Sequence, residues 1–270
     1  MLLASACTLL VDTTARQCAS HEDCGSLGLA GMQCVERVCQ SHDAIMVWSC
    51  LGNVARPASG ARMVSLTVRV VEALTMQAPA DLQAKFCSKL DVDCSHPFEG
   101  ASFLDQAGRL VAQVHAGFDG YIELSSSTTL PALFFVTLPV WQDTVIENVV
   151  LVLSAESFQG IASALGTTLD LEQRGDVFAL ASDCSGVPAP GVRFEVDRET
   201  ATTKRYYMVN NVPVGSATAT DAAGSGGFLN LESGFTSITG FVASSGARIG
   251  EAGFIVRAGA VSYPLILPSD

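Results

Sequence analysis

Short segments in which apolar and polar residues alternate recur along most of this chain, and they constrain its fold more than any other feature. In residues 61–74, Val64, Leu66 and Val68 alternate with more polar neighbours, which is the period of a half-buried strand. Similar segments bounded by Gly, Pro or Asp follow at 101–104, 109–114, 121–124, 130–140 and 145–154, and again beyond residue 170. The sequence therefore predicts an all-β protein.

One segment has helical spacing instead. It spans residues 155–168, with Ser154 as its expected N-cap and Gly166 as its expected stop. Its apolar residues recur at helical intervals and are Phe158, Ile161, Ala162 and Leu165. We expect a short linking helix over 155–170, with an apolar stripe that packs on a core, between one β unit at 44–154 and another at 171–270.

An internal repeat relates the two β units. FLDQAG at 103–108 corresponds to ATDAAG at 219–224, and Gly-Phe follows each of them, at 117–118 and 234–235. We also align the DCS triplets at 93–95 and 183–185. The repeat predicts two copies of one β fold, the second enlarged by a hairpin at Asn210-Asn211.

The second copy resembles the carboxypeptidase-regulatory-like, or transthyretin-like, β-sandwich family. The residues that carry the resemblance are GDVFALASDCSGVPAPGVRFEV (175–196) and TDAAGSGGFLNLESGFTSITGFVAS (220–244). The first copy matches less well, with Gly100-Ala101-Ser102-Phe103 where the second has Gly191-Val192-Arg193-Phe194. The resemblance implies two tandem Greek-key sandwiches of about seven antiparallel strands each, without conserved catalytic machinery.

Nine cysteines indicate an oxidising compartment, but their odd number leaves one thiol over. Leu3-Ala4-Ser5-Ala6-Cys7 resembles the lipobox of a bacterial lipoprotein signal, which implies a signal remnant at 1–7 and a lipid on the Cys7 thiol. Only six residues precede Cys7, fewer than a signal peptide needs, so this interpretation requires an upstream start. An ordinary N-terminal thiol is the alternative.

The remaining eight cysteines are enough for four disulfides. Residues 8–43 form a polar unit with cysteines at 18, 24, 34 and 39, resembling the tethers of Gram-negative surface lipoproteins. Their spacing favours disulfides over zinc, which prefers closer pairs, and their connectivity stays open. We expect Cys87 to pair with Cys94 across a short loop, which leaves Cys50 for Cys184. The disulfide candidates are Cys18, Cys24, Cys34, Cys39, Cys50, Cys87, Cys94 and Cys184.

Charge and hydropathy exclude several classes of protein. The net charge of −12 argues against nucleic-acid binding, which needs clustered Lys and Arg. No apolar run reaches the roughly 18 residues of a membrane-spanning helix, so we expect membrane attachment through the N-terminal lipid alone.

No catalytic set, metal site or cofactor motif stands out, and we predict none of them. A hydrolase could be imagined from His115, Asp119 and a serine among Ser125–Ser127, but a serine run after a strand is ordinarily a turn. Asp105 and Asp221 each precede a turn that ends in Gly, where an aspartate side chain bonds to the turn backbone.

Two further features could carry binding. Asp91 and Asp93 lie in the Cys87–Cys94 loop, but two carboxylates are too few for calcium. Tyr206 and Tyr207 should face opposite sides of a strand, so that only one of them is buried.

We therefore expect a non-enzymatic, lipid-anchored envelope protein, in the outer membrane or else periplasmic or extracellular, with a structural, protein-binding or glycan-binding role. A secreted hydrolase accessory domain or weak hydrolase, and a soluble periplasmic binding module, are the alternatives.

Overall fold

The computed structural model describes residues 18–20, 22–23, 32–35, 38–41, 47–54, 62–98, 102–105 and 108–269. The chain forms two compact units, Met1–Ser49 and Cys50–Asp270. The larger unit is built mainly of β-strands and contains the helix α3, so the predicted all-β class is confirmed.

The small unit contains a hairpin of β1 (Met32–Val35) and β2 (Val38–Ser41). A disulfide joins Cys18 to Cys34, with the two Cα atoms 5.8 Å apart. The Asp23 carboxylate accepts hydrogen bonds from the backbone N–H groups of Ala19 and Ser20. Local bonds and a disulfide therefore stabilise a segment that has little apolar surface to bury. Cys7 and Cys24 lie outside the described residues.

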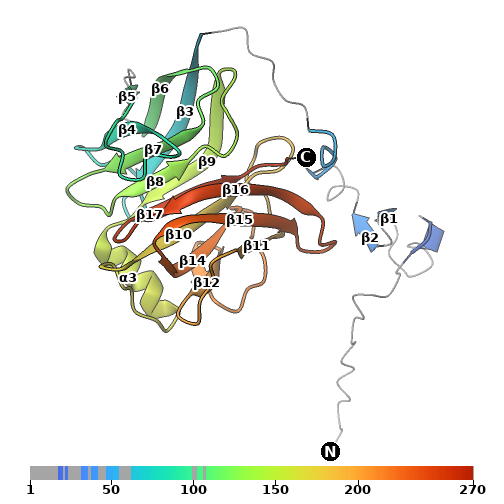
Figure 1. The fold of residues 1–270 in the computed structure, drawn as a ribbon. Helices are drawn as coiled ribbons and strands as arrows, with labels where there is room; N and C mark the ends of the chain where they lie inside the picture. Colours follow the sequence, from blue (N-terminus) through green and yellow to red (C-terminus); the bar gives the residue numbers. More distant parts are fainter. Residues whose placement is uncertain are drawn as a thin grey trace, which may run out of the picture. The chain divides into compact units, whose positions relative to one another are not determined.

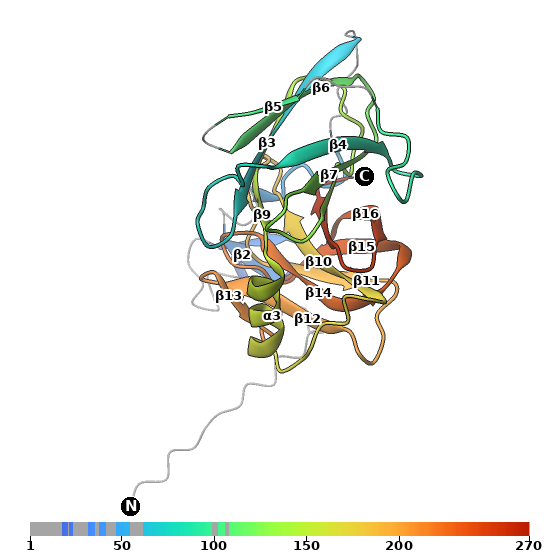
Figure 2. The same ribbon diagram turned by 90° about the vertical axis from the view of Figure 1, so that its left-hand side faces the viewer.

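The larger unit consists of two halves that share one order of strands (Figures 1 and 2). The first half contains β3 (Met63–Glu72), β4 (Gln83–Ser88), β5 (Ser102–Leu104), β6 (Arg109–His115), β7 (Gly120–Ser125), β8 (Ala132–Phe135) and β9 (Thr144–Val152). The helix α3 (Ala155–Ala164) follows, capped by Ser154 as predicted, because the Ser154 side chain accepts a bond from the Ser157 N–H. The second half contains β10 (Arg174–Ala181), β11 (Val192–Val196), β12 (Lys204–Val209), β13 (Val212–Val214), β14 (Ser225–Glu232), β15 (Gly234–Val242), β16 (Arg248–Val256) and β17 (Val261–Ile266).

Strand pairing shows the repeat directly. In the first half, the neighbouring strands are β5-β6-β3-β9 in one sheet and β4-β7-β8 in another. In the second half, they are β12-β14-β10-β17 and β11-β15-β16, which is the same order when the strands are matched along the chain. The extra strand β13 pairs with β12 through a two-residue turn at Asn210-Asn211, both at positive φ, which is the predicted additional hairpin. Each half is therefore a sandwich of a larger and a smaller sheet.

Two details differ from the expected Greek-key sandwiches. The strand that closes each larger sheet pairs in parallel, β9 with β3 and β17 with β10, so the sheets are mixed and not purely antiparallel. In addition, β17 pairs in parallel with β8, which joins both halves in one sheet of order β13-β12-β14-β10-β17-β8-β7-β4. The boundaries proposed at residues 154 and 171 stay a prediction.

The central strands of the eight-stranded sheet are buried on both faces. On one face Phe134, Phe178 and Tyr263 belong to a cluster that includes residues of β3, β6, β9 and α3. On the other face Phe135 contacts Phe254 of β16, and Tyr207 stacks on Phe194 of β11. The apolar stripe of α3 therefore packs on the core, as expected, with Phe158 and Ala162 fully buried.

The same turn precedes β6 in the first half and β14 in the second half. Gly108 and Gly224 have positive φ, and each donates its N–H to the carbonyl of the aspartate three residues earlier, Asp105 or Asp221. Each glycine carbonyl then accepts a bond from the first strand of its half, from Val70 at 2.7 Å or from Ala181 at 2.8 Å. The Asp105 side chain accepts the N–H of Arg109, the first residue of β6, and the Asp221 side chain accepts the N–H of Ala223, so both aspartates bond to the local backbone as expected.

Two alignments proposed for the repeat are wrong. The DCS triplet at 93–95 follows the second strand of its half, β4, whereas that at 183–185 follows the first strand, β10. Residues 102–104 form β5, whereas 192–196 form β11, whose counterpart in the first half is β4. The motifs are similar locally but occupy different strands.

Candidate functional site

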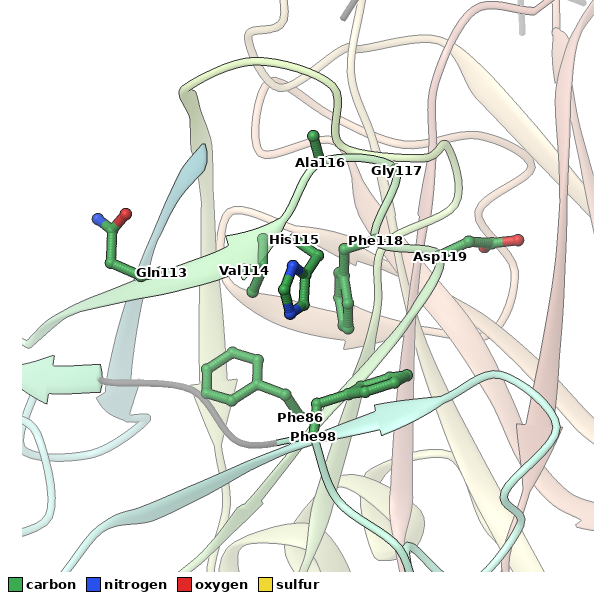
Figure 3. A pocket seen from close by; sticks show the side chains of 9 residues that line it. All are labelled: Phe86, Phe98, Gln113, Val114, His115, Ala116, Gly117, Phe118 and Asp119. Carbon is green, nitrogen blue, oxygen red and sulfur yellow. The ribbon is translucent and has the colours of Figure 1, made fainter. Parts of the chain in front are cut away.

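A pocket of about 270 Å³ opens at one end of the first half (Figure 3). Its lining residues come from β4, from the end of β6 and from the loops beside them. They are Phe86, Phe98, Gln113, Val114, His115, Ala116, Gly117, Phe118 and Asp119. Sequence reasoning singled out His115 and Asp119 here but missed the phenylalanines.

The disulfide loop brings two of these rings together. Cys87 and Cys94 are bonded, as the short spacing predicted, so the chain returns to β4 after a loop of six residues. Phe98 then pairs with Phe86, donating its N–H to the Phe86 carbonyl at 2.7 Å. The paired cysteines were thus the available signal that Phe86 and Phe98 lie side by side.

A tight turn supplies the third ring. Phe118 donates its N–H to the His115 carbonyl, and Gly117 donates to the Val140 carbonyl at 2.7 Å. Gly117 has φ +87°, and a Cβ there would lie 2.8 Å from the Trp141 ring. The glycine therefore allows Trp141 to pack closely against the turn that carries Phe118.

The phenylalanine rings meet edge to face. Phe118 contacts Phe86 with ring centroids 6.3 Å apart, and contacts Phe98 at 6.0 Å. Phe86 and Phe118 are buried, whereas Phe98 is 47% exposed. The pocket is therefore a hollow between aromatic rings, and Phe98 forms the part of its wall that is exposed at the surface.

Few polar groups face this hollow. In Figure 3 the side chains of Gln113 and Asp119 point away from the rings, and Asp119 is paired with Lys89 at 3.1 Å. The exposed His115 imidazole lies beside Phe118. The pocket is thus suited to an apolar group, and the His115 imidazole is part of its lining.

The imagined hydrolase set is not brought together. Ser125 ends β7, whereas Asp119 precedes the first residue of the same strand, so strand β7 separates them. The Ser126 hydroxyl lies within hydrogen-bond distance of Thr128 and Thr129, and the Ser127 N–H donates to Asp81. Ser126 and Ser127 thus lie in the polar loop after β7, as the sequence indicated, whereas Ser125 is the last residue of the strand.

The acidic loop is also organised by internal bonds. Asp91 accepts the backbone N–H groups of His96, at 2.8 Å, and Ser95. The His96 bond in particular holds the pKa of Asp91 below its usual value. Among the residues that the structure describes, no three His, Cys, Asp or Glu side chains gather as a metal site would require.

The expectation for the adjacent tyrosines is wrong. Tyr206 and Tyr207 do point to opposite faces of β12, but both are buried because both faces of the eight-stranded sheet are covered. The Tyr206 hydroxyl donates to the Val177 carbonyl, and the Tyr207 hydroxyl accepts the Phe194 N–H. They are core residues and do not form an exposed platform.

Two other hollows differ in character. One of about 600 Å³ lies between α3 and the β12–β13 hairpin, with Leu74, Met76 and Met208 in its mainly aliphatic wall. Another of about 420 Å³ is polar and includes Arg174, whose guanidinium already donates to the Asn230 carbonyl. Neither gathers several rings as the first pocket does.

In the part of the chain that the structure describes, no helix has the length and apolar character needed to cross a bilayer.

No protein-family model and no curated protein matches the chain. Among solved structures, the Bacillus anthracis TIE protein is 11% identical, with 77% of this chain and 34% of that chain covered and a TM-score of 0.24. This chain thus spans about a third of the TIE protein's length. The Streptococcal ancillary pilin is 12% identical, with 76% and 68% covered and a TM-score of 0.23. The shaft pilin spaA from Lactobacillus rhamnosus GG is 9% identical, with 77% and 98% covered and a TM-score of 0.23. Because these TM-scores are so low, the β-sandwich assignment rests on the strand order and pairing of this chain and not on the similarity to these structures.

Proposed function

We propose that this chain is a non-enzymatic protein of the bacterial cell envelope, which presents a stiff double sandwich to a binding partner. The observation that carries the proposal is the set of disulfides, Cys18–Cys34, Cys50–Cys184 and Cys87–Cys94. Disulfides form and persist in oxidising compartments, so they support an exported protein. Cys50–Cys184 also fixes the start of the larger unit to the second half, as expected for a body that must stay folded outside the cell.

The proposal includes a lipid on Cys7. Cys7 is the cysteine left over when the other eight pair, and the residues before it resemble a lipobox. One lipid anchor at the N-terminal side would hold the protein at a membrane, and we assign it to the outer membrane. A soluble periplasmic or extracellular module is the alternative without lipid.

The carboxypeptidase-regulatory-like relationship belongs to the same proposal. It is supported by the Asp-Ala-Ala-Gly turn at 221–224, which occurs in equivalent form at Asp105 and Gly108. Such modules accompany enzymes or surface proteins as packing or binding domains. The hydrolase alternative has less support, because Ser125–Ser127 lie at the end of β7 that is far from His115 and Asp119.

The test is the intact mass of the mature protein, produced from its full natural reading frame in a Gram-negative host. We expect a chain that starts at Cys7 and carries acyl mass, with a gain of eight hydrogens on reduction of its other eight cysteines. A Cys7→Ser variant should lose the acyl mass and leave the membrane fraction while keeping the same gain on reduction.

Two results would contradict parts of this proposal. A chain with an unmodified Met1 and free thiols would overturn export, and the cysteine-rich segment would then be reconsidered as a metal site. A chain with four disulfides but no acyl mass would overturn only the anchor.

A further inference from the structure

We propose that the pocket between Phe86, Phe98 and Phe118 receives one aromatic side chain of a protein partner. The inference names the partner class for the display role proposed above. It concerns the folded body alone and does not depend on the lipid.

The lining favours an aromatic group over a sugar. A sugar ring needs several hydrogen-bonding groups directed at its hydroxyls, but the backbone donors around this pocket are used within the protein. Ala116 donates to the Arg62 carbonyl, and the N–H groups of Gly117, Phe118 and Phe98 donate to Val140, His115 and Phe86. The rings already pack edge to face, and an incoming ring would extend that arrangement.

The size and surroundings of the pocket favour a side chain of a protein over a free small molecule. At about 270 Å³ it lies just below the range typical of small-molecule sites, which begins at about 300 Å³. Large apolar residues next to it in the strand pairing are partly exposed. Met63, which pairs with His115, is 42% exposed, and Trp141, beside Val140, is 39% exposed. A partner that covers them would bury this apolar surface together with the inserted ring.

The first measurement is a titration of the oxidised full chain, followed by amide NMR signals of Gly117 and Phe118. The probes are N-acetyl-phenylalaninamide, N-acetyl-leucinamide and methyl glucoside. We expect saturable shifts, with the phenylalanine probe bound most tightly. Phe98→Ala should weaken this binding about fivefold through loss of one ring contact. Phe235→Ala is the matched control, because Phe235 is 48% exposed on β15 and outside the pocket.

The second measurement separates a protein partner from a free aromatic compound. A capped five-residue peptide with a central phenylalanine between alanines should bind more tightly than the phenylalanine amide, because the flanking residues reach the exposed apolar surface. Equal affinities would overturn the protein partner, and binding of the glucoside alone would overturn the aromatic class. No saturable shift with any probe, or equal binding by Phe98→Ala, would overturn the site. None of these results bears on the mass test of export and lipidation.

Discussion

The guanidinium of Arg257 donates to the carboxylate of Glu123 at 2.6 Å and thereby joins the second half of the protein to the first. Its other terminal nitrogen donates to the Val92 carbonyl at 2.8 Å, inside the Cys87–Cys94 loop. The Tyr121 hydroxyl donates to the neighbouring Asp91 carbonyl. One arginine therefore connects the eight-stranded sheet, through Glu123 of β7, with the Cys87–Cys94 loop beside the aromatic pocket.

Removing this arginine should cost considerable stability. Arg257→Met leaves the Glu123 side chain, which is 12% exposed, without its closest partner, and we expect a loss of about 2–3 kcal/mol in the free energy of unfolding. Urea denaturation of the oxidised protein measures it. Arg248→Met removes an exposed pair with Glu251 and should cost less than about 1 kcal/mol. The double variant Arg257→Met/Glu123→Leu should regain most of the loss; if it does not, the ion pair is not the cause.

The equivalent turn glycines should be equally intolerant of a side chain. A Cβ on Gly108 would lie 2.5 Å from the Val70 carbonyl oxygen, and one on Gly224 would lie 2.6 Å from that of Ala181. Both residues also have positive φ, so Gly108→Ala and Gly224→Ala should each cost about 2–4 kcal/mol by thermal unfolding. Gly166 has a similar φ but no atom within 4 Å of its Cβ position, so Gly166→Ala should cost only about 1 kcal/mol. Equal losses of stability at all three positions would show that the positive φ alone, and not the close carbonyl oxygen, causes the loss.

The two disulfides of the larger unit should differ in their contribution to stability. Cys50–Cys184 spans 134 positions and Cys87–Cys94 spans 7, so loop-closure entropy predicts losses of about 5 and about 2 kcal/mol when each pair becomes serine. Denaturant unfolding of the two double variants gives the comparison. A larger loss for the short loop would show that contacts around the aromatic pocket, and not chain entropy, dominate.

Asp176 should make stability depend on pH. It is buried in β10, where burial raises its pKa to about 6 and the backbone N–H of Asn230 gives only partial compensation. The folded protein therefore holds this proton more tightly than the unfolded chain, whose aspartates titrate near about 3.9. The stabilising contribution is full below that value and is lost as the pH rises to about 6.

Asp176→Asn should remove this dependence and stabilise the protein by about 2–3 kcal/mol at pH 7 relative to the natural residue. Denaturation curves of both proteins between pH 4 and pH 7 measure the difference. A difference that is constant over this range would contradict the assignment to Asp176.

Local features of the fold could be predicted from the sequence because they depend on neighbouring residues. The alternation at Val64, Leu66 and Val68 marks β3, and the Ser154 cap and Gly166 mark the limits of α3. Cys87 and Cys94 pair because their loop is short, and Cys50 and Cys184 pair as expected from the cysteines left over.

The joining of the halves could not be predicted in the same way. ALFF in β8 and VSYPLI in β17 are apolar on both sides, so neither strand has a period that identifies its face or its partner. The burial of both Tyr206 and Tyr207 could not be predicted for the same reason, because the sequence does not show that a second layer covers the other face of β12. The pocket could be predicted only by inferring, from the Cys87–Cys94 disulfide, that the chain after Cys94 pairs with β4 and so brings Phe98 beside Phe86.

The position of β17 also sets an order on assembly. It is the last strand of the structure along the chain, yet it lies between β10 and β8 inside the eight-stranded sheet. Until it is in place, β8 and β10 each have an edge that another chain could pair with, and distant pairings of this kind form slowly. The sheet can therefore close only after the chain has been synthesised as far as Ile266, so β17 completes the folded body.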